Sequence, residues 1–490
     1  MGKRKKKPVI IPELLITGMA DKGRGIGRTG ENRVVFVEHV APGDIVDVRV
    51  VKKKPEYLDG YAVHYHRLSE DRVNPFCEHF HLCGGCRWQH LDYAAQVMHK
   101  EKMVRDAVRH IGRITAAEFL PILPAERTTY YRNKLEYAFS SKRWITKEEM
   151  DAGVSNVEDV LGFHRPGAFD KILDIRHCWL QEEPSNELRL LVKRTAIEQG
   201  LPFYDLRTNE GLMRHIMIRL TTLGELMLIV SFARPDRDAI RLFLDTLVER
   251  MPGLTTLLYC INPKLNDYVG DLDMVCYYGK GYIEEQLGHV RFKIGPKSFF
   301  QTNSWQARQL YDKVVEFAGL QGTENVYDLY TGVGSIALYV ARYCRQVVGI
   351  EEVPEAIADA EENARMNGTT NCVFYAGDVK QLLTRAFAER HGRPDLVITD
   401  PPRAGMHTEV VKMFLQLEAP RIVYVSCNPA TQARDLRLLS EKYELTRIQP
   451  VDMFPHTHHV ETVALLTLRS RPAEREVAGG MSQVDTSSIS

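Results

Sequence analysis

The sequence has no net excess of either charge, few cysteines and no long hydrophobic run. It contains 64 Lys or Arg and 64 Asp or Glu among 490 residues, so overall charge does not argue for a nucleic-acid partner. Nine cysteines are too few for a disulfide framework in a chain of this length, and those that cluster therefore indicate a metal or catalysis. No apolar stretch reaches the length of a membrane span, and Pro12 and Glu13 end the short apolar run near the N-terminus. We therefore expect a cytoplasmic monomer with no membrane partner.

The residue pattern changes along the chain, and a hydrophobic content of 44 % is enough for several packed domains. Residues 1–70 alternate short apolar runs with Gly, Pro and Asp, which predicts a small OB-like β-barrel. Residues 71–290 mix strand and helix patterns and predict an α+β domain, in which we expect a helix at residues 92–112 to pack on the following domain. Residues 291–470 alternate strands and helices, as a doubly wound, Rossmann-like α/β sheet does. Residues 471–490 are expected to be disordered.

A local basic excess distinguishes the N-terminal part. Residues 1–76 contain 15 Lys or Arg and 10 Asp or Glu, with lysine-rich runs at Lys3–Lys7 and Lys52–Lys54. Such runs attract phosphate by counterion release, but many of them are only solvated tails. An RNA-binding surface and a merely solvated one are both open on this pattern.

Three strand-like runs in the C-terminal part each end in a group that suggests chemistry. Cys427 lies in a Ser-Cys-Asn-Pro sequence directly after one apolar run, and Asp400 begins an Asp-Pro-Pro-Arg sequence after another. The third run ends in a glycine turn that contains Gly332 and Gly334. Because open parallel sheets hold their reactive groups at the carboxyl ends of strands, we expect a nucleophile, a carboxylate and a cofactor loop to meet there.

The glycine turn fits a degenerate dinucleotide-binding fingerprint. Glu351 ends the next strand, where a carboxylate accepts hydrogen bonds from ribose hydroxyls, and Gly332 and Gly334 permit close approach of a ligand. The pattern alone fits nicotinamide dinucleotides, S-adenosylmethionine or simple packing. Asp378 follows a further strand, where methyltransferase-like sheets contact the adenine amino group. Asp400 with its two prolines favours S-adenosylmethionine, because such strand ends form base-contacting loops in nucleic-acid methyltransferases.

Cys427 is suited to covalent catalysis on a pyrimidine. Carbon C5 of uracil is a poor nucleophile until a thiolate adds to C6, which makes C5 enolate-like and able to accept a methyl group. The C5 proton must then leave before the thiol can, and Glu461, just before an apolar strand, is the candidate base. The alternatives are that Cys427 is a buried, inert thiol and that Glu461 pairs with Arg434.

A second group of cysteines suggests a bound metal. Cys77, Cys83 and Cys86 have the spacing C-x5-C-x2-C, with two glycines between the last two, and Cys178 lies alone much later in the chain. Four thiolates satisfy either tetrahedral zinc or a cubane iron–sulfur cluster, and the spacing does not decide between them. Histidines nearby leave a mixed zinc site open: His79, His81 and His90.

Taken together, these motifs resemble the bacterial RNA uracil-5-methyltransferases, of the iron–sulfur 23S rRNA type with an N-terminal TRAM domain. The resemblance extends from about residue 10 to residue 470. The segments that carry it are Gly18–Gly27, Cys77–His90, Cys178, Phe299–Asn303, Asp328–Gly334, Asp400–Gly405, Ser426–Thr431 and His458–Glu461.

The resemblance implies residue roles and cofactors. It implies a [4Fe–4S] cluster rather than zinc on the four cysteines, and S-adenosylmethionine as the methyl donor. It makes Cys427 the nucleophile and Glu461 the base. It assigns contacts with S-adenosylmethionine or uracil to Gln301, Tyr330, Glu351 and Asp400. Ser335 and Asp378 stand where the family varies.

Other functions remain open on the sequence. The combination of TRAM domain and cysteine cluster favours ribosomal RNA as the substrate. Transfer RNA is the alternative substrate. Methylation of an exocyclic adenine amine would leave Cys427 without a role. A non-catalytic RNA-binding or assembly factor would bind RNA but not S-adenosylmethionine, and a redox enzyme lacks a recognisable hydride-acceptor site.

Overall fold

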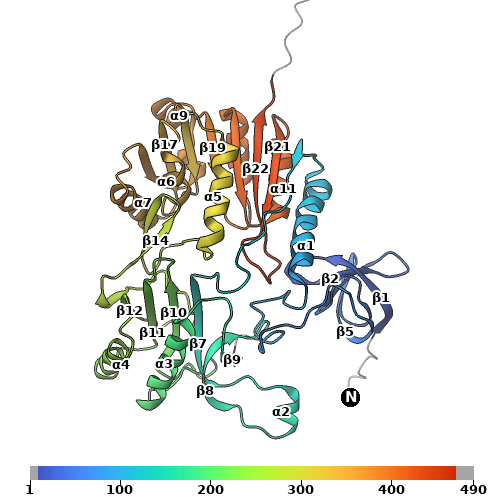
Figure 1. Cartoon of the computed structure of the whole chain (residues 1–490), viewed down its shortest axis with the longest axis vertical. Helices are drawn as coiled ribbons and strands as arrows, with labels where there is room; N and C mark the ends of the chain where they lie inside the picture. The colour runs from blue at the N-terminus through green and yellow to red at the C-terminus, as the bar shows by residue number, and fades with distance from the viewer. Residues whose placement is uncertain (1–8, 169, 471–490) are drawn as a thin grey trace, which may run out of the picture.

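The computed structural model describes residues 9–168 and 170–470, so the basic run Lys3–Lys7 and the expected tail 471–490 lie outside the described residues. Figure 1 shows a small barrel at one side and two larger sheets, the C-terminal one above the central one. Within the described ranges, no helix combines the length and the apolar character needed to cross a membrane.

The N-terminal part forms a closed barrel, which confirms the predicted barrel fold. Its strands follow one another around the barrel in the order β1-β2-β3-β5-β4. Alternate residues fill the interior, as a half-buried strand requires, and Val35, Val37, Val46 and Val48 are fully buried there. The elements are β1 (Val9–Met19), the short 3₁₀ helix η1 (Asp21–Gly23), β2 (Gly25–Arg28), β3 (Val34–Glu38), β4 (Ile45–Lys53) and β5 (Tyr57–Arg67).

The central part is a mixed sheet covered on both faces. Its strand order is β13-β12-β11-β10-β7-β8-β9, and β10 and β11 are almost entirely buried. Alternate residues of β10 serve two cores, because Ile216 packs with the central helices whereas Met217 packs with the C-terminal core. The strands are β7 (Lys134–Lys142), β8 (Val157–His164), β9 (Ile172–Asp174), β10 (Met213–Leu220), β11 (Leu226–Phe232), β12 (Thr256–Ile261) and β13 (Val275–Gly279). The helices are α2 (Lys147–Asp151), α3 (Ser185–Glu198) and α4 (Arg237–Arg250).

The C-terminal part is the predicted α/β sheet, in the order β18-β17-β16-β19-β20-β22-β21-β6. Strands β16 to β20 are all parallel to one another, β22 runs antiparallel to both of its neighbours, and β21 is parallel to β6. The strands are β6 (Glu118–Phe119), β16 (Asn325–Leu329), β17 (Gln346–Glu351), β18 (Cys372–Ala376), β19 (Leu396–Thr399), β20 (Arg421–Ser426), β21 (Tyr443–Val451) and β22 (Glu461–Leu468). The helices are α5 (Ser304–Ala318), α6 (Ser335–Ala341), α7 (Pro354–Met366), α8 (Val379–Leu382), α9 (Arg385–His391), α10 (Thr408–Leu417) and α11 (Pro429–Leu439), and a hairpin of β14 (Ile283–Leu287) and β15 (Val290–Ile294) leads into them.

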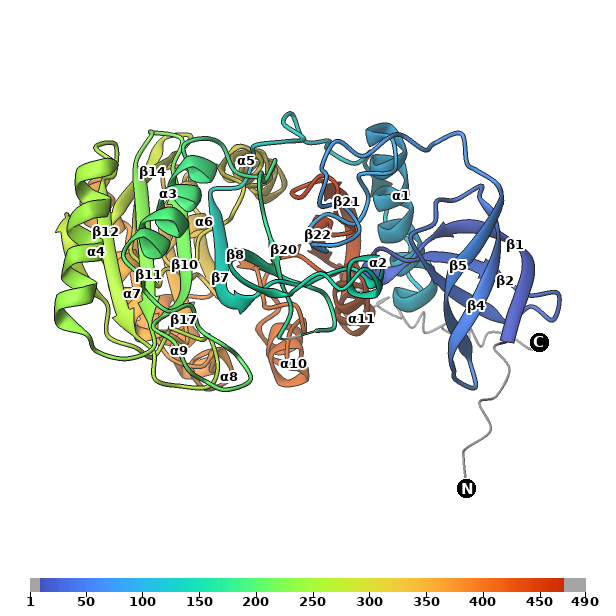
Figure 2. The ribbon, with the colours of Figure 1, turned by 90° about the horizontal axis from the view of Figure 1, so that it is seen from below.

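Helix α1 (Tyr93–Asp106), continued by the π-helical turn η2 (Ala107–Gly112), lies between the barrel and the C-terminal sheet (Figures 1 and 2). The spacing of Ala95, Met98 and Val104 predicts an apolar face, but Met98 is 55 % exposed. The face that is buried carries Gln96 and Lys100 in addition to apolar residues. Polar groups are buried at this junction because they bind a loop of the C-terminal sheet, which periodicity alone does not reveal.

Candidate active site

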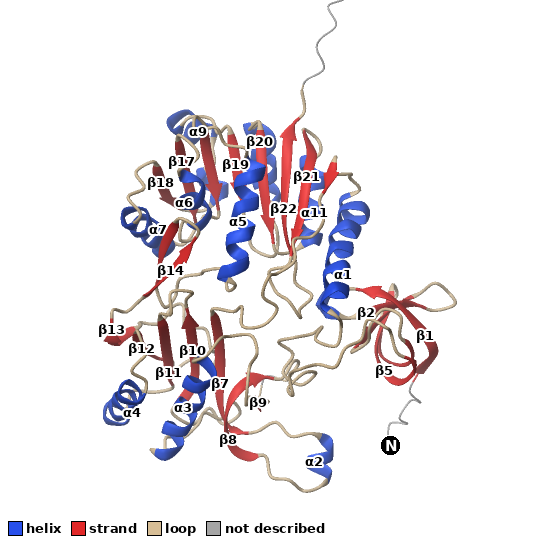
Figure 3. Cartoon of the chain, viewed as in Figure 1, coloured by secondary structure: helices blue, strands red, loops and turns tan. Residues whose placement is uncertain are grey.

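Loops at the carboxyl ends of β16, β19 and β20 gather between the C-terminal and central sheets (Figure 3). Strands β17 and β19 flank β16 on opposite sides, and such a reversal of strand order opens a crevice for ligands. Because β22 is antiparallel to β20, it begins at the edge of the sheet where β20 ends. The start of β22 therefore joins the strand ends singled out in the sequence.

The register of β20 and β22 brings Cys427 and Glu461 to the same place. Ser426 pairs with Thr462, so Cys427, which follows Ser426, and Glu461, which precedes Thr462, both lie where this pairing ends. The two side chains are close enough for the Glu461 carboxyl to raise the pKa of the Cys427 thiol. Two residues that are distant in the sequence thus share one strand end.

The Cys427 loop is fastened to the loop that follows Asp400. Asn428 Nδ2 donates to the Arg403 carbonyl at 3.1 Å, and Thr431 Oγ1 donates to the same oxygen at 3.2 Å. Asn428 also caps α11, and Pro429 occupies the first turn, which is a favourable start for a helix. These bonds hold the thiol half-buried at the end of β20.

Arg434, the alternative partner for Glu461, pairs with Asp435 instead. Its Nη2 lies 2.8 Å from Asp435 Oδ1, and the buried Asp435 also accepts a hydrogen bond from Met406 N at 2.8 Å. This cluster supports the chain that follows Asp400. The buried Glu461 carboxyl instead has Asp400 and Arg403 as its charged neighbours.

Negative groups crowd this site. Burial, reinforced by Glu461 and Asp400, raises the pKa of the Cys427 thiol to about 12, while Arg403 opposes the rise. Burial, reinforced by Asp400, raises the pKa of Glu461 to about 8, and Glu461 is only 5 % exposed. Burial, reinforced by Asp328, raises the pKa of Asp400 to about 7. A cation bound among these groups would favour their ionised forms and lower each pKa.

The glycine turn after β16 has the shape of a cofactor cradle. Glu351 Oε2 accepts from Gly332 N at 3.1 Å, and Oε1 accepts from Val353 N at 3.0 Å, so this carboxylate fixes the turn. Gly332 has φ +56°, and a Cβ there would meet no atom within 4 Å. At Gly334, with φ +78°, a Cβ would press on Ala360 at 3.1 Å. Gly332 therefore keeps the turn open to a ligand, while Gly334 permits close helix packing.

Tyr330 and Asp378 flank the same turn. Burial, reinforced by Asp378, raises the pKa of Tyr330 to about 12, and Tyr330 has the left-handed φ of +64°. Asp378 accepts from Lys380 N at 2.9 Å, which caps α8 and lowers the pKa of the carboxyl. Asp378 thus has a local structural role at the position where the sequence predicts an adenine contact.

Gln301 lies in the loop that leads into α5. Asn133 of the central part donates from Nδ2 to the Gln301 carbonyl and to Ser304 Oγ, both at 2.8 Å. Asn303 caps α5 and donates from Nδ2 to the Met453 carbonyl at 2.9 Å. The loop therefore ties the central sheet, α5 and the β21–β22 connection together beside the crevice.

Two further residues belong to the site. Arg403 is the positive group that opposes the raised pKa values of Cys427 and Glu461, and its position directly after Asp-Pro-Pro is a signal that the sequence offered. Tyr311 of α5 is 2 % exposed, and burial together with Asp400 raises its pKa. Nothing in the sequence around Tyr311 distinguishes it from other core aromatics, so only packing reveals it.

The four cysteines line one cavity of about 570 Å³, to which Thr302 of the Gln301 loop also contributes: Cys77, Cys83, Cys86 and Cys178. Aromatic walls come from Phe80, Phe163 and Trp179. The Asn186 side chain makes two hydrogen bonds with the Cys178 backbone. Its Oδ1 accepts from Cys178 N at 2.8 Å, and its Nδ2 donates to the Cys178 carbonyl at 3.2 Å. Among residues 9–168 and 170–470, no three His, Cys, Asp or Glu side chains converge as ligands of a single metal ion.

The three nearby histidines take part in hydrogen bonds outside the cysteine group. His79 Nε2 accepts from Arg176 N at 3.0 Å, and His90 Nε2 lies 3.1 Å from the Val40 carbonyl. His81 Nδ1 lies 2.8 Å from the matching nitrogen of His39. These contacts fasten the cysteine segment to its surroundings and give the mixed Cys/His zinc site no support.

Comparison with known proteins agrees with this geometry. Residues 7–63 match the TRAM domain, and residues 276–469 match the tRNA (uracil-5-)-methyltransferase family. An uncharacterized RNA methyltransferase of Bacteroides thetaiotaomicron is 52 % identical over 455 residues, covering 92 % of this chain and 100 % of the relative. Another, from Chlorobaculum tepidum, is 40 % identical over 461 residues, covering 93 % of this chain and 95 % of the relative.

A solved structure has the same architecture. The crystal structure of Pyrococcus abyssi tRNA (uracil-54, C5)-methyltransferase in complex with S-adenosyl-L-homocysteine is 28 % identical, with a TM-score of 0.71. The match covers 93 % of this chain and 99 % of that one. The chain therefore belongs to the RNA uracil-5-methyltransferase family, as an S-adenosylmethionine-dependent enzyme with an N-terminal TRAM domain.

Proposed function

We propose that this enzyme methylates C5 of a uridine in 23S rRNA through a covalent adduct between Cys427 and uracil C6. The observation that carries the proposal is that Cys427 and Glu461 lie together where the pairing of β20 and β22 ends, within electrostatic reach of Asp400. A nucleophile and a base on one strand end are what attack at C6 and deprotonation at C5 require. An enzyme that methylates exocyclic amines would have no use for the thiol.

Each side chain has a defined task in this chemistry. A uridine flipped out of folded RNA enters the crevice, since a stacked base exposes neither face to a sulfur and a methyl donor at once. S-adenosylmethionine supplies the methyl group to C5 and leaves as S-adenosylhomocysteine. Cys427, ionised to the thiolate, bonds through sulfur to C6 beforehand, and Glu461 afterwards takes the C5 proton. The C5–H electron pair then restores the C5=C6 double bond, and sulfur leaves with its bonding pair.

The residues around the crevice supply binding as well as chemistry. The open turn at Gly332 and the carboxylate of Glu351 suit the ribose end of S-adenosylmethionine, with Tyr330 and Gly334 in the same turn. Gln301 is a further contact that the family resemblance implies. Asp400 would bind the polar edge of the uracil. The crowding of carboxyl groups favours a cationic sulfonium over its neutral product, which helps the product to leave.

Ribosomal RNA is our proposed substrate class, and we place the reaction in the cytoplasm. The combination of a TRAM barrel with a four-cysteine centre supports this choice. The alternative is transfer RNA, because the Pyrococcus abyssi neighbour is a tRNA methyltransferase. Both RNAs present the same uracil chemistry, so the choice depends on surfaces outside the crevice.

One experiment tests both the chemistry and the RNA class. Transcripts of 23S rRNA and of tRNA that contain 5-fluorouridine are incubated with enzyme and S-adenosylmethionine, and protein-bound RNA is measured on a denaturing gel. We expect a stable adduct with 23S rRNA, because no base removes fluorine as a cation. An adduct with tRNA alone would reassign the substrate, and no adduct with either RNA, from enzyme that methylates the ordinary transcript, would reject the covalent mechanism.

We further propose that the four cysteines hold a [4Fe–4S] cluster. The cavity that they line is wide, and its aromatic side chains provide an apolar wall beside a cofactor. A single zinc ion would instead need four thiolates within about 2.3 Å of one point. The cluster is held by segments far apart in the chain, so we expect it to stabilise their arrangement rather than to transfer electrons.

Iron content tests this second proposal directly. We expect enzyme purified without oxygen to contain about four iron and four sulfide per chain, with broad visible absorption. Replacing Cys86 with serine should remove most of the iron and lower the melting temperature, whereas replacing the exposed Cys276 should change neither. Stoichiometric zinc in place of iron would show that the cluster assignment is wrong.

A further inference from the structure

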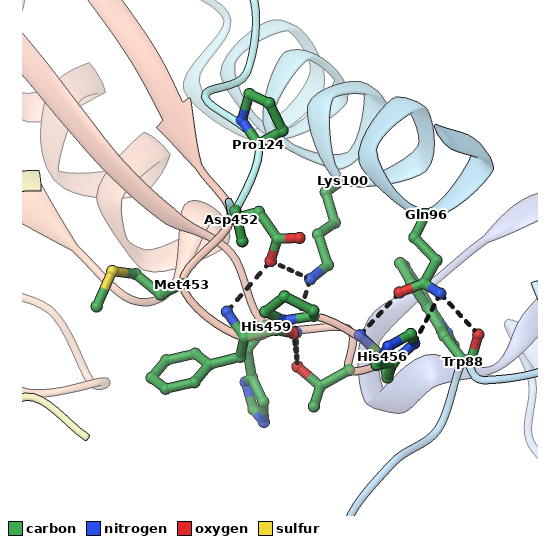
Figure 4. A network of polar contacts seen from close by, with 12 residues as sticks. Trp88, Gln96, Lys100, Pro124, Asp452, Met453, His456 and His459 are labelled. Carbon is green, nitrogen blue, oxygen red and sulfur yellow. Dashed lines mark hydrogen bonds and ion pairs between the residues drawn. The ribbon is translucent and has the colours of Figure 1, made fainter. Parts of the chain in front are cut away.

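The loop that precedes Glu461 is anchored by a buried ion pair. Residues 452–460 connect β21 to β22, and Asp452 at the start of this loop is fully buried together with Lys100 of α1. Lys100 Nζ lies 2.6 Å from Asp452 Oδ1 and donates to the Phe454 carbonyl at 2.9 Å, so one ammonium group holds two points of the loop (Figure 4). The loop ends where the proposed base begins.

The middle of the same loop is bound to the cysteine segment. The His456 carbonyl accepts from Arg87 N at 2.8 Å and from Trp88 N at 2.9 Å, directly after Cys86 in the sequence. His456 N donates to Gln96 Oε1 at 2.8 Å, and Gln96 Nε2 donates to the Trp88 carbonyl at 3.1 Å (Figure 4). Polar contacts from α1 and from the cysteine segment therefore converge on residues 452–460.

Stability alone does not explain a buried pair at this place. Removing two charges from water costs much of what their attraction returns, so apolar side chains would stabilise the junction as well or better. A charged pair does, however, restrict geometry, because Asp452 Oδ1 also accepts from Phe454 N at 3.1 Å and Oδ2 accepts from Tyr93 OH at 2.9 Å. Four hydrogen bonds with fixed directions locate the loop more narrowly than apolar contacts would.

We propose that Lys100 and Asp452 are positioning residues, which hold the 452–460 loop so that Glu461 faces C5 of the bound uracil. The inference rests on the proposed function, since it concerns the step that Glu461 performs. Cys427 belongs to a different loop, which is fastened to the Arg403 carbonyl. Disturbing the ion pair should therefore slow proton removal and leave thiol addition and methyl transfer nearly intact.

The test separates these steps with an ordinary uridine substrate. Single-turnover reactions with methyl-labelled S-adenosylmethionine are stopped in denaturant, and the label is divided between free RNA and protein-bound RNA. For Asp452→Asn and Lys100→Met we expect release of methylated RNA to slow roughly 10- to 100-fold, the scale of a small misplacement of a catalytic group. The rate of methyl transfer should stay within about threefold of wild type, so labelled adduct accumulates.

A double variant and a matched control make the result decisive. Lys100→Met with Asp452→Leu removes both charges and should fold even where a single variant does not, because it leaves no unpaired buried charge. Asp44→Asn is the control, since Asp44 is a fully buried carboxylate paired with Arg72 at 2.7 Å in the barrel, away from Glu461. It should lower the melting temperature without accumulation of adduct.

The outcomes distinguish this inference from the function on which it rests. The positioning role would be overturned if the folded double variant released methylated RNA at the wild-type rate. It would also be overturned if all loop variants lost methyl transfer and RNA release equally. If instead wild-type enzyme forms no adduct with 5-fluorouridine RNA, the covalent mechanism itself fails.

Discussion

Replacement of Cys427 by alanine is expected to abolish methylation, with turnover falling on the order of 10⁴-fold or more. Without the thiol no bond forms at C6, and C5 remains too weak a nucleophile to accept the methyl group. The side chain is half-buried at a strand end rather than in a core, so the variant should fold and still bind S-adenosylmethionine. Incorporation of labelled methyl groups measures the loss, and the 5-fluorouridine adduct should vanish with it.

The control for this variant is the exposed Cys276, a thiol on β13 of the central sheet. Cys276→Ala should keep full turnover and form the adduct, which shows that the effect belongs to one thiol. Full turnover by Cys427→Ser would contradict the covalent mechanism and favour methylation of an exocyclic adenine amine. Calorimetric titration with S-adenosylmethionine separates a chemical loss from a failure to bind.

Replacement of Glu461 by glutamine is expected to trap the reaction after methyl transfer. The C5 proton has no acceptor in the variant, so turnover should fall about 10²- to 10⁴-fold while methylated RNA stays bound to Cys427. A denaturing gel of the reaction with ordinary uridine RNA should show this adduct. Loss of turnover without any adduct would assign proton removal to another group.

The pH dependence follows from the raised pKa of Glu461. The base must be ionised, so release of product should quicken as pH rises toward about 8 and level off above it, and Glu461→Gln should lose this dependence.

The stability of the folded protein should change with pH in the opposite direction. The Glu461 carboxyl loses its proton above about pH 4.5 in the unfolded chain but only above about pH 8 in the folded protein. The free energy of unfolding therefore falls as pH rises from about 4.5 to about 8. The melting temperature of Glu461→Gln should therefore be higher than that of wild type at pH 9 and equal to it near pH 4.

The parts of the fold that repeat a local pattern could be predicted from the sequence. Alternating burial in the barrel, as at Val35 and Val37, and the strand–helix alternation of the C-terminal part follow from periods of 2 and 3.6 residues. The Asp-Pro-Pro and Ser-Cys-Asn-Pro sequences mark strand ends because proline stops a strand and asparagine starts a helix. These local signals placed Cys427, Asp400 and the glycine turn at one edge of the sheet.

The reversal of β22 could not be predicted in the same way. Strand direction depends on how the chain returns to the sheet, and no local residue pattern in Glu461–Leu468 records it. Yet this reversal alone brings Glu461 to the end of β20. The polar face of α1 is a similar case, because the burial of Lys100 makes sense only when Asp452 arrives from a distant segment.

By itself the sequence determined which chemical groups are available: one thiol at a strand end, carboxylates after neighbouring strands, a glycine turn, and three clustered cysteines with a fourth far along the chain. Tertiary structure alone decided how Glu461 is brought to the thiol and what acidity each group has. Burial beside Asp400 gives Glu461 a pKa of about 8, and only long-range packing creates such burial. The reactivity of this site is therefore a property of the assembled strand ends rather than of any one motif.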